Sequence, residues 1–345
     1  MMAHAMSHPT VKLAARAACV AVLELAMDAT EMKQWLSSVA RLTARQRTEL
    51  LKALGAGADE AQVRSLVESR LDVHPACPHC AATHIVRNGN ASGLQRYKCR
   101  ACRRSFNALT ATPLARLRLK AKWLKQQDVL LQGLSVHQGA DALGVSPSTA
   151  FRWRHRFLRL AQPVKAAALT GVVEADETFF LRSSKGQRPG RQARKRGGRV
   201  SRARRGEDLI PILVARDRSG ATADFLLDAV SKDCLTQALK PTLQADAILC
   251  TDGSAAMAAA AIDLKVQHEA LNLSAGERVR GPWHIQNANG YHGRLKGWIA
   301  RFKGVATDHL QSYLGWFRAL DRASKNPRKS APLLALAIGL AGITN

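Results

Sequence analysis

Acidic residues are scarce in this chain of 345 residues. Asp and Glu together number 26 against 52 Lys and Arg, which gives a formal net charge of +26 at pH 7. The positive excess is spread along the chain, and a charge of this size repels itself unless anions neutralise it. The composition therefore predicts a polyanionic partner, and nucleic acid is the class that fits best. The alternative is an unusually soluble basic protein.

Long apolar runs are also lacking. A transmembrane helix needs roughly eighteen or more consecutive apolar residues, and the longest early candidate, 14–27, is interrupted by Arg16 and Glu24. A signal peptide is the alternative interpretation of this region, because Lys12 and Arg16 precede an apolar patch, although no clean cleavage site follows. We expect a cytoplasmic, nucleoid-associated protein that has no membrane partner.

Cysteines are few, and four of the seven form two pairs, Cys77-x2-Cys80 and Cys99-x2-Cys102. The spacing predicts a four-thiolate zinc site that organises a zinc ribbon over residues 71–112. Two disulfides or unrelated thiols are the alternative, but such a framework would be sparse for a chain of this length. The other three cysteines lie in apolar contexts that argue against export. They are Cys19, Cys234 and Cys250.

Basic residues surround the second cysteine pair. The segments between the pairs, 85–94 and 96–98, are long enough only for a small hairpin that has no core without metal. We therefore expect the zinc to stiffen a surface that faces DNA. The basic residues of that surface are Arg96, Lys98, Arg100, Arg103 and Arg104.

The length predicts two to four domains, and residues 1–70 are expected to form a helical region. Apolar residues there follow helical spacing until Gly55 and Gly57, which are expected to end the helix. These apolar residues are Met32, Trp35, Leu36, Val39, Leu50, Leu51 and Leu54. We expect the region to cover the next domain; binding DNA or a second subunit are the alternatives.

Residues 113–165 have a helix-turn-helix pattern. Helices are predicted at Trp123 to Leu134, Ser135 to Leu143 and Pro147 to Leu160, with Ser146 as the cap of the third. The exposed face of the third helix is expected to enter a major groove, and a plain helical hairpin is the alternative. Its predicted core residues are Ala150, Trp153 and Phe157. Its predicted DNA-facing residues are Thr149, Arg152, Arg154 and Arg156.

Two apolar stretches carry aspartates at strand positions. Asp176 lies inside the predicted strand 172–180, and Asp252 ends the predicted strand 247–251 just before a turn and an alanine-rich helix. Two such carboxylates can share a divalent cation such as Mg²⁺, while an edge-strand acid that faces water is the alternative. Strand alternation places Glu177 on the face opposite Asp176, so a structural role is expected for it.

A basic run at 185–205 contains ten Lys or Arg residues and no acid, among them Arg194, Lys195 and Arg196. We expect it to be a loop that meets phosphate, with a merely solvated loop as the alternative. Around it, strands are predicted at 209–215, 223–227 and 265–270, and a helix at 231–243. Three antiparallel strands followed by alternating helices and strands is the order of the ribonuclease H-like fold.

The predicted fold is therefore an α+β multidomain protein. A helical N-terminus, a zinc ribbon and a helix-turn-helix precede a ribonuclease H-like mixed sheet flanked by helices. The sheet domain spans 166–325, contains the basic insertion 185–205, and is followed by a C-terminal tail at 326–345.

Over about residues 77–320 the chain resembles the DDE-type transposases of bacterial insertion sequences, specifically the insertion sequence 1595 family. The matching segments are the two cysteine pairs with 97–106, the segment 176–179, the segment 251–253, and 284–291 with Lys296. The resemblance implies cleavage and strand transfer of DNA with two Mg²⁺ or Mn²⁺ ions. It implies double-stranded DNA partners, namely the element's terminal repeats and target DNA, and a homo-oligomer on DNA.

In that family the third metal-binding position lies on a late helix, as Glu or Asn, with a Lys seven residues on. Asn289 and Lys296 fit the version with Asn. Helical geometry places Asn289, Gly293 and Lys296 on one face, which we expect to turn toward the sheet. His284 and His292 are weaker candidates for DNA contact. A neutral third ligand also makes two alternatives thinkable, a DNA-binding regulator without catalysis and a nuclease that does not join strands.

Overall fold

The computed structural model describes residues 30, 33–34, 37–38, 41–183, 208–325 and 333–338. The predicted basic insertion lies outside this part of the chain, and with it Arg194, Lys195 and Arg196. By its internal contacts the chain divides into two units, Met1–Ala58 and Asp59–Asn345. No helix in the described part of the chain is long and apolar enough to cross a membrane.

The first long helix, α3 (Ala44–Val73), runs straight through the two glycines that were expected to end it. The prediction of a stop at Gly55 and Gly57 is therefore wrong. A glycine inside a helix costs only about 1 kcal/mol relative to alanine, and the neighbouring Ala53, Ala56 and Ala58 favour helix. Further along α3, Val63, Val67 and Leu71 are buried in the core of the second unit.

The zinc-ribbon region forms a small antiparallel sheet of β1 (Ile85–Ala91), β2 (Leu94–Cys99) and β3 (Ser105–Asn107), in that order. Ala91 pairs with Leu94, so Ser92 and Gly93 alone make the hairpin turn. Both have positive φ, 51° and 71°, as the tightest hairpin turns require. The sequence predicted this hairpin but not β3, which pairs Phe106 with Tyr97.

The helix-turn-helix is confirmed as η1 (Lys120–Lys122), α4 (Trp123–Leu131), α5 (Val136–Leu143) and α6 (Pro147–Leu158). Ser135 and Gln138 form a capping box at the start of α5, and the Ser146 side chain accepts from the Thr149 backbone N–H at the start of α6. Such caps satisfy donors that a helix cannot satisfy itself. Trp123, Trp153 and Phe157 are buried at the centre.

The central sheet has the strand order β6-β5-β4-β7-β8. Its members are β4 (Val172–Leu181), β5 (Leu209–Asp217), β6 (Thr222–Leu226), β7 (Ile248–Thr251) and β8 (Gln267–Ala270). The pairs β4/β5 and β5/β6 are antiparallel, whereas β4/β7 and β7/β8 are parallel. The expected mixed sheet is therefore confirmed, with the two aspartate strands next to each other.

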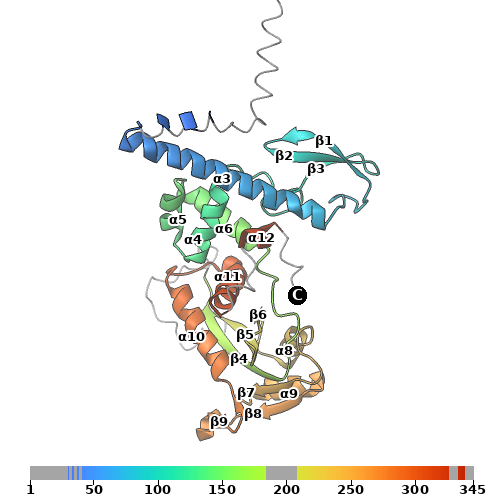
Figure 1. Ribbon diagram of the computed structural model, residues 1–345. Helices are drawn as coiled ribbons and strands as arrows, with labels where there is room; N and C mark the ends of the chain where they lie inside the picture. The colour runs from blue at the N-terminus through green and yellow to red at the C-terminus, as the bar shows by residue number, and fades with distance from the viewer. Residues whose placement is uncertain are drawn as a thin grey trace, which may run out of the picture. The chain divides into compact units, whose positions relative to one another are not determined.

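Helices cover both faces of this sheet (Figure 1). On one side α8 (Lys232–Leu239) and α9 (Ala255–Leu264) pack on alternate residues of the strands, including Val173, Ala175 and Leu213. On the other side α10 (Gln286–Ala300) and α11 (Thr307–Lys325) pack on Ile212 and Val214. The remaining short elements are η3 (Leu273–Ala275), β9 (Val279–Arg280), β10 (Trp283–His284) and α12 (Leu333–Ala337).

Buried ion pairs join α11 to the sheet. Arg216 on β5 donates to Asp321 at 2.9 Å, and Arg318 on α11 pairs with Asp224 on β6. Tyr291 also donates to Asp224, at 3.0 Å. Burial alone would raise the pKa of Asp321, but the hydrogen bond and charge of Arg216 outweigh burial and lower it. These charges are compensated inside the core and take no part in an open site.

Candidate active site and zinc centre

The four paired cysteines converge on one point, and all six cysteines of the described residues are free thiols. The Cys77 and Cys102 sulfurs lie 3.7 Å apart, and those of Cys80 and Cys99 lie 3.6 Å apart. A tetrahedron with Zn–S bonds of about 2.3 Å has S···S edges of about 3.8 Å. The geometry therefore fits a zinc ion and excludes the disulfide alternative.

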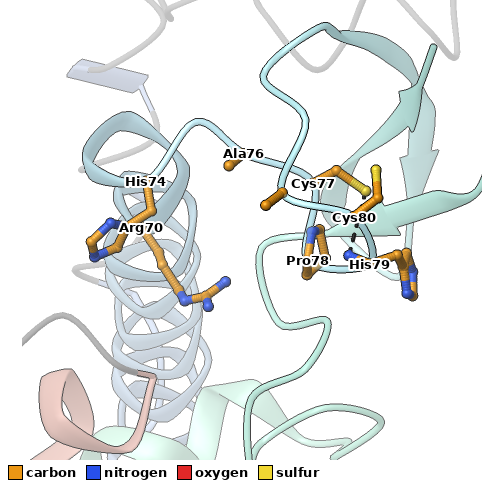
Figure 2. Close-up of a pocket in the computed structure, with 8 residues that line it drawn as sticks. Arg70, His74, Ala76, Cys77, Pro78, His79 and Cys80 are labelled. Atoms are coloured by element: carbon orange, nitrogen blue, oxygen red, sulfur yellow. Dashed lines mark hydrogen bonds between the residues drawn. The ribbon is translucent and has the colours of Figure 1, made fainter. Parts of the chain in front are cut away.

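Backbone N–H groups point at two of these sulfurs. His79 N–H donates to Cys77 Sγ at 3.4 Å, as Figure 2 shows, and Cys102 N–H donates to Cys99 Sγ at 3.5 Å. The backbone N–H of Cys102 lowers the pKa of Cys99 to about 7. The two N–H donors and the lowered pKa of Cys99 favour the thiolate, which is the form that binds metal.

The residues predicted to face DNA are exposed with some exceptions. Lys98, Arg103, Arg104 and Arg152 are exposed, whereas Arg96 and Thr149 are half-buried. The Thr149 hydroxyl lies 3.0 Å from the Ser146 hydroxyl in the cap of α6. Arg100 and Arg156 are also exposed.

Arg154 contradicts the prediction that it lies on an exposed face, because only 2% of it is accessible. Its Nη2 donates to the Leu134 carbonyl at 2.6 Å, and its guanidinium lies 5.2 Å from the ring centre of Trp316. Helical spacing contained the signal, since Ala150, Trp153 and Phe157 are buried and position 154 shares their face. Arg154 therefore joins the helix-turn-helix to α11.

Asp176 and Asp252 lie side by side at the edge between β4 and β7. Glu174 pairs with Cys250 in the parallel ladder, so the same register carried two residues further brings Asp252 beside Asp176. β7 ends at Thr251, and Asp252 accepts from the Ser254 backbone N–H at 3.0 Å in the following turn. The juxtaposition agrees with the expectation that the two carboxylates can share one cation, and not with an acid that faces water alone at an edge strand.

Glu177 joins the same cluster, which corrects the expectation of a structural role on the opposite face. Carboxylate oxygens of Asp176, Glu177 and Asp252 all lie within 4.8 Å of one another. β4 runs four residues past Glu177 whereas β7 ends at Thr251, and the Glu177 side chain is half-buried beside the two aspartates. Alternation along an ideal strand could not reveal this.

The electrostatics of the cluster call for a cation. Burial, and then repulsion from Asp176 and Asp252, raise the pKa of Glu177 to about 7. Its Oε1 is buried without a hydrogen-bond partner in the described part of the chain. No Lys or Arg among the described residues pairs with the three acids. A hard divalent ion such as Mg²⁺ or Mn²⁺ suits this all-oxygen donor set.

Glu174, two residues before Asp176, is fully buried and fixes α10 against the sheet. Its Oε2 accepts from the backbone N–H groups of Asn287 at 2.7 Å and Ala288 at 3.0 Å. The first residues of α10 lack a cap of their own, so this carboxylate satisfies donors at the positive end of the helix. Arg218 approaches the other oxygen at 3.0 Å. The sequence analysis did not assign this residue any role.

His292 is the residue of α10 that contacts Asp176. Its Nδ1 lies 3.5 Å from Asp176 Oδ2, the side chain is 8% exposed, and its Nε2 has no partner within the described residues. His292 was expected only as a weak candidate for DNA contact. The sequence does indicate that position 292 is buried, because it lies on the same face of the helix as an apolar stripe. That stripe consists of Ala288, Tyr291, Leu295 and Ile299.

Asn289 and Lys296 lie on the exposed side of α10, next to the face that carries His292. Neither side chain makes a hydrogen bond or ion pair within the described residues. Gly293 has nothing within 4 Å of the position a Cβ would take, so no close approach to the sheet is made at this glycine. The three residues share a face, as predicted, and this face is exposed beside the His292 that contacts Asp176.

Three family models match the chain. The ISXO2-like transposase domain matches residues 168–318, the InsA N-terminal domain matches 72–103, and a homeodomain-like domain matches 112–163. The resemblance to the insertion sequence 1595 family is thereby confirmed. The uncharacterized protein in transposable element ISH50 of Halobacterium salinarum is 29% identical over 261 residues, which cover 74% of this chain and 88% of that protein.

Similarity to solved structures is remote. A chain of a simian T-cell lymphotropic virus intasome bound to a PP2A regulatory subunit is 10% identical, with a TM-score of 0.27 over 61% of this chain and 73% of that one. The Mos1 transposase in its paired-end complex with the left transposon end is 15% identical, with a TM-score of 0.22 over 63% and 78%. Scores this low establish nothing about this chain.

Proposed function

Because this chain carries the ISXO2-like transposase domain of the insertion sequence 1595 family, we propose that it binds the ends of its own element and cuts and rejoins DNA there. The observation that carries the proposal is the convergence of Asp176, Glu177 and Asp252 at one strand edge inside the matched domain. A cluster of oxygen ligands without a protein cation is what metal-dependent phosphoryl transfer requires.

In this proposal Asp176 and Asp252 hold two Mg²⁺ or Mn²⁺ ions, and Glu177 supplies a third carboxylate. When bound, the ions neutralise charge on the attacking and leaving oxygens of the phosphodiester. Asn289 can add a neutral carbonyl oxygen, and Lys296 can contact a phosphate beside the acids, because both are exposed on α10. His292 acts as a positioning residue that orients Asp176.

DNA recognition is assigned to the two small domains. On the ribbon, Arg96, Lys98, Arg103 and Arg104 are proposed to contact phosphates, which set register without reading sequence. On α6, Arg152 is the exposed candidate for a base edge and Thr149 contributes at the helix start. Arg194, Lys195 and Arg196 are proposed as further phosphate contacts, and a homo-oligomer would bring two element ends together.

The decisive assay offers purified protein a duplex that contains an element end, with Mg²⁺ or Mn²⁺, and resolves the products. A transposase yields cleaved ends and joined products in which an end 3′ hydroxyl has attacked target DNA. Cleaved ends without joined products would identify a nuclease. Specific binding without either product would identify a regulator, and would overturn the assignment of catalysis to the carboxylate cluster.

A further inference from the structure

The stretch between Asp72 and Asp128 contains no acidic residue and eleven Lys or Arg residues. The ribbon carries part of this charge. The rest lies in the segment between the ribbon and α4, where Arg116, Arg118 and Lys120 occupy every second position. This segment connects the ribbon to the helix-turn-helix, and the proposed function above gives it no part in DNA binding.

The segment forms one wall of an open cleft of about 1260 Å³ against β3 of the ribbon. Arg116, Arg118, Lys120 and Arg156 line it together with a single acid, Glu60. That acid already pairs with Arg64 at 2.6 Å. The cleft is therefore strongly positive.

The four cations differ in what holds them. Lys120 Nζ donates to the Ser92 carbonyl at 2.9 Å, and Arg156 Nη1 donates to the Ala115 carbonyl at 3.2 Å. These two bonds fasten the segment to the ribbon turn and to α6. Arg116 and Arg118 are exposed, and neither side chain forms a hydrogen bond or ion pair within the described residues.

The backbone beneath the two free arginines is held in place. Arg116 adopts a φ of 63°, a left-handed conformation that is unfavourable for arginine. Buried Leu114 anchors one side, and on the other the Trp123 indole N–H donates to the Arg118 carbonyl at 3.2 Å. Two guanidinium groups are thus presented to the cleft from a fixed frame, and most of their donors are unused.

We propose that this cleft binds the sugar-phosphate backbone of duplex DNA, with Arg116 and Arg118 each contacting a phosphate. The cations follow one another along an open surface, which suits a repeating polyanion better than a single small anion. Arg156 shares α6 with Arg152, so the bound backbone flanks the groove that α6 enters. This inference rests on the proposed binding of DNA but not on the proposed cleavage.

The test measures affinity of the full-length protein for end duplex and for scrambled duplex by fluorescence anisotropy over a range of salt concentrations. One lost phosphate contact lowers the slope of log affinity against log salt by about 0.9, which corresponds to about fivefold in affinity near physiological salt. Arg116→Gln and Arg118→Gln should each show this loss equally on both duplexes. Lys240→Gln removes an equal charge from an exposed site after α8 and should change neither quantity.

The outcomes distinguish a failure of the proposed cleft from a failure of the proposed DNA binding as a whole. Loss in both arginine variants, and not in the lysine control, supports the cleft. Unchanged affinity and slope in the arginine variants, while the wild-type protein binds, overturns the cleft and leaves the proposed function intact. An equal loss in the lysine control would also overturn it, since only net charge would matter. A wild-type protein that binds neither duplex overturns both proposals.

Discussion

The thiolate cluster of the ribbon and the carboxylate cluster of the central sheet are both ready to bind metal, but they are built differently. The four thiols come from one short segment that forms a three-stranded sheet, whose buried Leu94 and Phe106 belong to one cluster with Val63 and Val67 of α3. The carboxylates come from β4 and from the end of β7, on a sheet covered by helices on both faces. Because structural zinc supplies much of the folding energy of small zinc domains, we expect the ribbon to depend on its ion and the central sheet to fold without one.

Removing one zinc ligand is expected to give the largest difference between the two sites. Cys99→Ser should abolish zinc binding and unfold residues 77–106, because structural zinc supplies about 10 kcal/mol or more of folding free energy. The central sheet should stay folded. Zinc content by metal analysis and limited proteolysis of each domain check this, with Cys234→Ser as the control outside the cluster. Folded wild-type protein with far less than one zinc per chain would sink the assignment.

The carboxylate site should instead depend on the packing of α10 against the central sheet. Glu174→Ala leaves the first N–H groups of α10 and the Arg218 guanidinium without their buried partner, which should cost about 3 kcal/mol of unfolding free energy. Urea unfolding measures the loss. Asp233→Ala, at an exposed acid in the first turn of α8, should change stability by less than about 0.5 kcal/mol. Equal effects of the two changes would show that Glu174 does not hold α10.

Glu177 and Asn289 test which side chain completes the carboxylate site. Glu177→Gln removes a buried charge, so it should raise stability without metal by on the order of 1 kcal/mol, after allowing for partial exposure. It should also weaken Mn²⁺ binding by on the order of tenfold, since a charged ligand is lost. Asn289→Ala should change both quantities less. Calorimetric Mn²⁺ titration and thermal unfolding report them, and a larger loss of Mn²⁺ affinity in Asn289→Ala would reverse the assignment.

A smaller effect concerns pH and a histidine outside both clusters. Burial, then the charges of His309 and Arg154, lower the pKa of His155 to about 4. Between that value and the unfolded pKa of about 6.5, only the unfolded chain binds the proton, so stability falls as pH drops through this window. His155→Gln should remove on the order of 1 kcal/mol of this dependence. Urea unfolding at both ends of the pH window measures this dependence, and the exposed His137→Gln serves as the control. Equal pH dependence of stability in the wild type and in His155→Gln would contradict the assignment.

Local patterns predicted much of the fold. The cysteine spacing, the serine cap of α6 and the order of strands and helices each depend on neighbours in sequence, and each was confirmed. Asp176 and Asp252 were predicted to be able to share one cation because each follows apolar strand residues, and the structure places them side by side. These features carry their information within short segments, so one sequence is enough to read them.

What the sequence analysis missed depends on packing between distant segments. Periodicity showed that Asn289 and Lys296 share a face, but not that His292 between them contacts Asp176, because that contact depends on how α10 packs on the sheet. Arg154 was predicted to face DNA because its partners lie outside α6: the Leu134 carbonyl is in the turn between α4 and α5, and Trp316 is on α11. The approach of Glu177 to the two aspartates depends on how β4 lies beside the end of β7, which alternation along a single strand does not contain.

The central claim is that the carboxylate cluster cuts DNA with divalent metal, and it is tested most directly by the rate of Mg²⁺-dependent cleavage of end-containing duplex. Asp176→Ala and Asp252→Ala should each reduce this rate by on the order of a thousandfold or more, because each removes a charged ligand of the ions that stabilise developing oxyanions. End binding should stay nearly unchanged in both. Cleavage by either variant at the wild-type rate would contradict the claim and place the active site elsewhere.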